Sequence, residues 1–170
     1  MPIEYIILIS VAVLLVALFI IVSCTQFSKL SKLKATVKES FSTLEVFLQK
    51  RLEIIVKLLD NCSEEALKDK ELSNLLNSVS QLKQNLQNQW RYKLEANLDN
   101  AVLTAQDSLQ KYNSAKNQQL ILNLNTVQSD IISTKNYYNN NVEAYNKKLN
   151  KFPSNLVARM FGFKKEYYIK

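Results

Sequence analysis

The sequence predicts an all-α protein, in which an N-terminal transmembrane helix is followed by an antiparallel up-and-down bundle of four long helices. No Gly or Pro occurs between Ile3 and Phe152, a stretch in which an ordinary domain has many such helix breakers. The chain begins with a long apolar run, and further on its apolar residues recur at steps of three, four or seven. Such steps place apolar side chains on one helical face, whereas a half-buried strand alternates with period two.

Residues 1–26 are interpreted as an uncleaved transmembrane anchor. The apolar run Tyr5–Cys24 has the length of about 20 residues that a helix needs to cross a bilayer. A signal peptide begins with basic residues and has a shorter apolar core, but here only Glu4 carries a charge before the run.

Four lysines without an intervening acid follow the anchor: Lys29, Lys32, Lys34 and Lys38. Because basic residues accumulate on the cytoplasmic side of a span, we expect the N-terminus outside and the remaining chain in the cytoplasm. The lysines are candidates for contact with anionic lipid headgroups.

A competing interpretation is an exported lipoprotein. Residues 21–24, Ile-Val-Ser-Cys, resemble a processing box in which Cys24 would be lipidated. Export would require the opposite orientation to the one that the flanking lysines favour, and the basic start of a leader is missing.

Residues 27–153 form the predicted bundle. Breaks between its helices are expected at 61–65, where Ser63 can cap the next helix, within 84–90, and near 113–118. With four helices, the C-terminus returns toward the bilayer. Three apolar stripes mark the buried faces: the first contains Phe41, Leu44, Leu48, Leu52, Ile55, Leu59 and Cys62; the second Leu72, Leu75, Val79, Leu82, Leu86, Trp90, Leu94 and Leu98, continuing through Ala105, Leu109 and Tyr112; the third Leu120, Leu124, Val127, Ile131, Tyr138, Val142, Tyr145, Leu149 and Phe152.

Residues 154–170 form a basic and aromatic tail. The formal net charge of the chain is +7, and most of it lies after residue 146. Pro153 ends the last bundle helix, Ser154 can cap a short helix, and Gly162 can close it.

Two interpretations of the tail remain open. Aromatic residues mixed with basic ones, such as Lys164 and Lys165, suit a membrane interface. Alternatively, the apolar residues Leu156, Val157, Met160, Phe161 and Phe163 fold back over the end of the bundle.

The C-terminal third contains the pattern Tyr-Asn, two residues, Val, two residues, Tyr-Asn, then Phe-Pro and Gly-Phe, in the pairs Tyr138-Asn139, Tyr145-Asn146, Phe152-Pro153 and Gly162-Phe163 with Val142. This pattern resembles the C-terminal signature of the LemA family. A second match is Arg51–Leu58, with Glu53 and Val56 where the family has Asp and Pro. The resemblance implies a bacterial, single-pass protein of the inner membrane with an antiparallel helical bundle, and no known catalytic activity. The matching residues at the C-terminal end are Tyr138, Asn139, Val142, Tyr145, Asn146, Leu149, Phe152, Pro153, Ala158, Gly162 and Phe163.

These motif residues have a structural interpretation. Tyr138, Tyr145 and Phe152 lie on the third stripe and should pack inward. Asn139 and Asn146 are seven residues apart on one helix edge, where they can bond tyrosine hydroxyls, an arginine or a neighbouring helix. Arg51, beside a buried position and near Glu53, is expected in an ion pair at the edge of the core.

The composition argues against an enzyme. The chain contains no His, no Gly-rich phosphate loop and no metal-ligand spacing, so we expect no catalytic residue, cofactor or metal. Charges of alternating sign on the helices are typical of solvated faces and argue against nucleic acid. The sequence favours a membrane-tethered scaffold whose partners are the lipid bilayer and either an unknown protein or a second copy.

Overall fold

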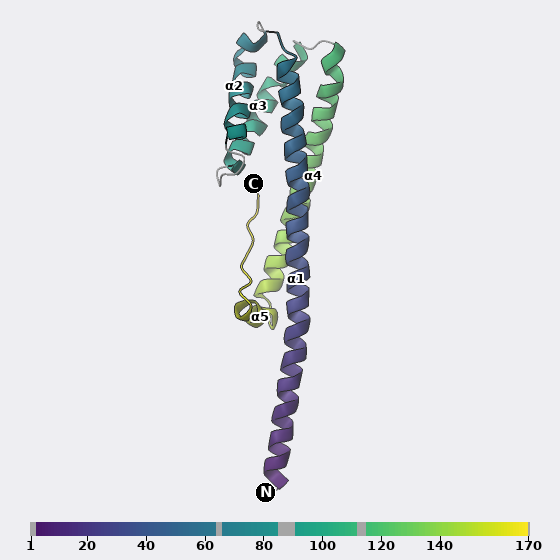
Figure 1. The fold of residues 1–170 in the computed structure, drawn as a ribbon, viewed down its shortest axis with the longest axis vertical. Helices are drawn as coiled ribbons and strands as arrows, with labels where there is room; N and C mark the ends of the chain where they lie inside the picture. The colour runs from purple at the N-terminus through teal and green to yellow at the C-terminus, as the bar shows by residue number, and fades with distance from the viewer. Residues whose placement is uncertain (1–2, 64–65, 85–90, 112–114, 170) are drawn as a thin grey trace. The chain divides into compact units, whose positions relative to one another are not determined.

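The computed structural model describes residues 3–63, 66–84, 91–111 and 115–169, and within these ranges the chain is entirely helical or irregular, with no strand (Figure 1). The all-α prediction is therefore confirmed. The elements are α1 (Ile3–Asp60), the 3-10 helix η1 (Ala66–Lys68), α2 (Lys70–Gln84), α3 (Arg91–Lys111), α4 (Ala115–Asn150) and α5 (Ser154–Met160).

The predicted breaks agree with the helix bounds. α1 ends at Asp60, and Ser63 Oγ then accepts a hydrogen bond of 3.2 Å from the Ala66 N–H, at the start of η1. The break expected within 84–90 lies between α2 and α3, although residues 85–90 themselves are outside the described residues. α4 begins at Ala115, so residues 115–118 of the break expected near 113–118 are helical, and residues 113 and 114 are outside the described residues.

The chain divides into two compact units. Unit 1 comprises residues 1–43 and 135–170, and unit 2 comprises residues 44–134. Both α1 and α4 contribute to each unit.

The core of unit 2 is built from the predicted stripes. Most stripe positions of α1 and α4 in this unit are buried, although Leu120 is only partly buried, and α2 packs its apolar face against α3. Full burial of such an aliphatic side chain contributes about 1.5–3 kcal/mol, so this packing is the main stabilising contribution in the unit. The buried aliphatic side chains on the stripes are Leu44, Leu48, Leu52, Ile55, Leu59, Leu72, Leu75, Val79, Leu82, Leu98, Ala105, Leu109, Leu124, Val127 and Ile131.

The core of unit 1 joins three helices. Buried side chains from α1, α4 and α5 form one cluster, and apolar residues of the C-terminal tail pack against it. The short helix α5 therefore contributes to a core. The buried members are Leu30, Val37, Tyr138, Val142, Tyr145, Val157 and Ala158.

The sequence predicted the C-terminal end of α5 correctly but not its N-terminal cap. Ser154 was expected to cap this helix, but it is the first helical residue, and its Oγ instead bonds Gln26 Oε1 at 2.8 Å. The C-terminal end agrees: Gly162 adopts a φ of 70°, and the Phe163 N–H donates to the Ala158 carbonyl at 2.9 Å. This bond spans five residues back, as in a helix end closed by a left-handed glycine.

The predicted burial of Phe152 is wrong. Its side chain is 79% exposed. The third stripe placed it inward by continuing the helical period, but α4 ends at Asn150, so that period no longer applies.

Candidate functional site

The last residues of the chain form an extended segment that α4 holds by its side chains. This terminal segment, residues 163–169, has no regular secondary structure and belongs to unit 1 (Figure 1). The Tyr145 hydroxyl donates a hydrogen bond of 2.8 Å to the Lys164 carbonyl. The Tyr138 hydroxyl donates one of 2.9 Å to the Tyr167 carbonyl.

The two asparagines each make a pair of hydrogen bonds with one residue of the terminal segment. Asn146 Nδ2 donates to the Glu166 carbonyl at 2.8 Å, and Asn146 Oδ1 accepts from the Glu166 N–H at 3.1 Å. Asn139 makes the same pair with Ile169, at 2.9 and 3.0 Å. Each carboxamide thus takes the place of the backbone that a neighbouring strand would offer. We call these four side chains the Tyr-Asn ladder.

The spacing of the ladder matches the pitch of the segment that it holds. Seven helical residues separate the two Tyr-Asn pairs, which corresponds to about 10.5 Å along α4. Their targets are three residues apart, and three extended residues span about 10 Å. The motif Tyr-Asn, five residues, Tyr-Asn is therefore a device that fixes the register of an extended chain on a helix.

The environment of the tyrosines keeps their hydroxyls protonated. Burial raises the pKa of both Tyr138 and Tyr145, and the negative charge of Glu166 raises each pKa further. A neutral phenol can donate a hydrogen bond to a carbonyl, whereas a phenolate cannot. The raised pKa values extend to higher pH the range in which both hydroxyls can donate.

All six ladder bonds go to backbone atoms of the terminal segment. The Tyr167 side chain is 84% exposed, and that of Tyr168 is exposed too. Phe163 is the inward anchor: its ring lies 5.6 Å from the ring of Phe27, and the amine of Lys34 lies 5.9 Å from its centre.

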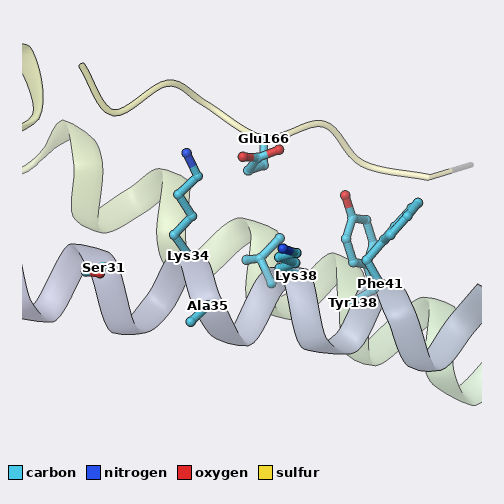
Figure 2. Close-up of a pocket in the computed structure, with 8 residues that line it drawn as sticks. Ser31, Lys34, Ala35, Lys38, Phe41, Tyr138 and Glu166 are labelled. Carbon is cyan, nitrogen blue, oxygen red and sulfur yellow. The ribbon is translucent and has the colours of Figure 1, made fainter. Parts of the chain in front are cut away.

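A cavity of about 480 Å³ lies in unit 1 beside the ladder (Figure 2). Most of its lining comes from α1, Tyr138 contributes from α4, and Glu166 of the terminal segment contributes a carboxylate. Figure 2 shows Lys34 extending from α1 toward the terminal segment. The lining residues are Ser31, Lys34, Ala35, Val37, Lys38, Phe41, Tyr138 and Glu166.

The predicted headgroup lysines fall into two groups. Lys34 and Lys38 line this cavity, where they share the space with Glu166. Lys29 and Lys32 are exposed elsewhere on α1. Lys164 and Lys165 are exposed on the terminal segment, although the Lys164 carbonyl accepts a ladder bond.

A second polar cluster lies in unit 2, around the motif residue Arg51. This guanidinium is fully buried at 0% exposure and pairs with two carboxylates of α3, those of Glu95 at 2.5 Å and of Asp99. Its Nη1 also lies 3.4 Å from Gln128 Oε1 on α4. A buried guanidinium requires such partners, because removing its charge from water costs several kcal/mol. We call this group the Arg51 network.

The expected ion pair between Arg51 and Glu53 is wrong. Arg51 is in the core and not at its edge, and Glu53 is exposed. The sequence analysis missed Glu95 and Asp99 as its partners. A usable signal was present, because Glu95 is three residues before the stripe residue Leu98, at a position that helical spacing turns inward.

The expected roles of the other motif residues fare better. Tyr138 and Tyr145 pack inward as predicted. Asn139 and Asn146 do share one edge, but they bond the terminal segment and not tyrosine hydroxyls or Arg51. Gly162 lies between α5 and the terminal segment, of which Phe163 is the first residue, and the Phe152–Pro153 junction lies between α4 and α5.

Fold and site together define a class: a helical protein with an apolar helical segment at its N-terminus and a C-terminal segment held by a Tyr-Asn ladder. One described helix, α1, is long and apolar enough to cross a membrane. The model of the LemA family matches residues 40–170, which include the ladder and the Arg51 network. The chain belongs to the LemA family. No curated protein matches it closely.

Proposed function

We propose that this protein is a non-enzymatic, single-pass protein of the bacterial inner membrane, whose antiparallel four-helix bundle serves in the cytoplasm as a scaffold or interaction module. The observation that carries the proposal is the surface of α1 from Ile7 to Val22, where every side chain is exposed. Exposed aliphatic side chains around the whole circumference of a helix are unfavourable in water, and a bilayer removes that cost.

The orientation follows from charge. Lys29, Lys32, Lys34 and Lys38 come directly after the apolar segment, on the side that the positive-inside rule assigns to the cytoplasm. In this orientation the anionic lipids of the inner leaflet attract the lysines.

A scaffold role is supported by how the polar motif residues are used. The Arg51 charge is neutralised by Glu95 and Asp99, and the ladder tyrosines donate to backbone carbonyls. These groups hold the fold together, so the interaction surface must lie outside them. The exposed side chains of Tyr167 and Tyr168 offer aromatic contacts of the kind common in protein interfaces.

Proximity labelling in native membranes, with the labelling enzyme at the C-terminus, tests this proposal. We expect labelled cytoplasmic and inner-membrane proteins, and a protein that resists extraction by alkaline carbonate. A variant lacking residues 1–26 is the control, and it should leave the membrane fraction. Labelling confined to the outer side of the membrane would refute the cytoplasmic orientation. The absence of both reproducible neighbours and self-association would refute the scaffold role.

A second candidate is an exported or lipid-anchored surface protein with Cys24 lipidated. It is favoured by the exposure of Cys24, which leaves its thiol accessible for modification. Intact mass measurement distinguishes the two: cleavage before Cys24 with an added lipid supports export, whereas an unprocessed chain supports the anchor. Apart from the mass difference of the substitution itself, a Cys24→Ser variant should change the mass pattern only if the thiol is modified.

A further inference from the structure

Helix α5 has a buried face and an exposed apolar face. Val157 and Ala158 pack into the core of unit 1. The large apolar side chains of Leu156 and Met160, and of Phe161 just after the helix, remain exposed. A cluster of exposed large side chains on one short helix is unfavourable in water and marks a surface with a partner.

The exposed face of α5 continues directly into the apolar surface of α1. The ring of Phe161 lies 4.8 Å from that of Phe27. Between the two helices lies an apolar cavity of about 340 Å³. From α1 it is lined by Phe19, Ile20, Ser23, Cys24 and Phe27, and from α5 and its end by Met160 and Phe161.

This continuity identifies the partner, because Phe19 and Ile20 belong to the segment that we place in the bilayer. The lipid that surrounds those two side chains would also contact the cavity and the exposed face of α5. Basic residues surround this region in the sequence: Lys29 on α1, Arg159 on α5 and Lys164 after it. An apolar face accompanied by basic residues is typical of a helix lying in the surface of an anionic membrane.

We propose that α5 is an interfacial helix: it lies in the cytoplasmic leaflet beside the end of the span, and a phospholipid acyl chain occupies the cavity between α5 and α1. The inference rests on the proposed membrane insertion of α1. It places the bilayer boundary on α1 near Ser23–Phe27. It also assigns the apolar lipid contact to α5 and not to the terminal segment, because the ladder holds that segment against α4.

Quenching of tryptophan fluorescence by brominated lipids tests the proposal in the full-length protein. The single natural tryptophan is replaced by Trp90→Phe, and one new tryptophan is introduced at a time. Phe161→Trp reports on α5. Tyr137→Trp on α4 is the matched control, because both are exposed aromatic residues of unit 1, at 54% and 56%. Leu14→Trp reports on the span. Each protein is reconstituted into vesicles of phosphatidylcholine and phosphatidylglycerol, with bromine either near the headgroup or near the chain end.

We expect Phe161→Trp to be quenched several-fold more strongly than Tyr137→Trp, and most strongly by bromine near the headgroup. Leu14→Trp should be quenched best by bromine near the chain end. Circular dichroism confirms that each variant keeps its helix content, and Met160→Trp provides a second reporter on α5 if Phe161→Trp does not fold.

The outcomes separate the two proposals. Quenching of Leu14→Trp together with equal, weak quenching of both Phe161→Trp and Tyr137→Trp would overturn the interfacial helix and leave the span in place. A blue-shifted but unquenched Phe161→Trp would show that a second copy covers α5, which also overturns it. No quenching of Leu14→Trp would overturn both the insertion of α1 and the inference built on it.

Discussion

The two units use their polar motif residues in opposite ways. In unit 2, Arg51 is buried among side chains of other helices, and its bonds go to carboxylates and an amide. In unit 1, the Tyr-Asn ladder bonds the backbone of a segment that has no regular structure. One arrangement pairs charge with charge inside a core, while the other supplies the hydrogen bonds that a strand would otherwise find in a sheet.

The difference has an energetic consequence. A buried charge that loses a partner is left uncompensated, so the Arg51 network should fail as a whole. A ladder of neutral hydrogen bonds is divisible, because each bond contributes about 1 kcal/mol and the backbone can bond water when it is released. Unit 2 should therefore lose global stability when its motif is altered, and unit 1 should lose only the docking of its terminal segment.

The largest expected effect comes from breaking the Arg51 network. Arg51→Met removes the buried cation that pairs with the carboxylates of Glu95 and Asp99, and we expect unfolding to become easier by about 3–5 kcal/mol. Urea unfolding followed by circular dichroism in detergent measures this loss.

The matched control for Arg51→Met also removes the buried carboxylate of Glu95 and leaves only that of Asp99, whose side chain is 35% exposed. Arg51→Met combined with Glu95→Leu replaces the pair by apolar side chains, and such replacements are often neutral or stabilising. We expect the double variant to regain most of the lost stability. A double variant as unstable as Arg51→Met would show that the network stabilises the fold by something other than charge pairing.

Alkaline pH should release the whole terminal segment. Because the folded state raises the pKa of Tyr138 and Tyr145, their contribution to docking is fully present below the ordinary value of 10.0 and is lost as the pH rises through the raised values. Deprotonation removes two donors and leaves phenolates facing carbonyls and Glu166.

Tyrosinate absorbance and the anisotropy of a dye at the C-terminus measure this release. A late-titrating phase of absorbance should coincide with a fall in anisotropy, while circular dichroism still reports the helices. The variant Tyr138→Phe/Tyr145→Phe should lack the late phase. Release of the dye below pH 10, with both tyrosines still neutral, would contradict the role given to their hydroxyls.

Removing one asparagine should release part of the segment. Asn146→Ala deletes both bonds to Glu166, and we expect the docking equilibrium to weaken by about 1–3 kcal/mol. Hydrogen exchange should speed up at the Glu166 amide. Asn140→Ala, at an exposed position on the same helix, is the matched control and should leave exchange unchanged. Protection of Glu166 that survives Asn146→Ala would remove Asn146 from the ladder.

Much of this architecture could be predicted from the sequence, because apolar periodicity is a local signal. The stripes correctly placed their residues from Leu44 to Leu59 and from Leu72 to Leu82 in the core. The turn signal at Ser63 correctly marked the end of α1. The inward packing of Tyr138 and Tyr145 followed from the same period.

The sequence analysis did not find the partners of the motif residues, because helical spacing can turn a residue such as Glu95 inward but does not determine which residue it meets in the tertiary structure. The spacing of Asn139 and Asn146 does not indicate that each bonds an extended backbone further along the chain, 30 residues after Asn139 and 20 residues after Asn146. Arg51 likewise finds its carboxylates 44 and 48 residues away, while the nearby Glu53 faces solvent. The exposure of Phe152 depends on where α4 stops, which periodicity alone does not determine.

The smallest expected effect tests whether the ladder is divisible. Tyr145→Phe keeps the buried ring and removes only the bond from its hydroxyl to the Lys164 carbonyl, so docking should weaken by about 1 kcal/mol. Tyr138→Phe should give a similar loss of docking by removing the bond from its hydroxyl to the Tyr167 carbonyl.

If the ladder is a set of separate bonds, the two losses add in the double variant, and the free energy of unfolding of unit 2 does not change. Hydrogen exchange across residues 163–169 measures the docking, and urea unfolding measures the remainder of the fold. A double variant that loses far more than the sum would show that the terminal segment docks as one cooperative unit. The contrast between the two units would then lie in which atoms they pair and not in how they come apart.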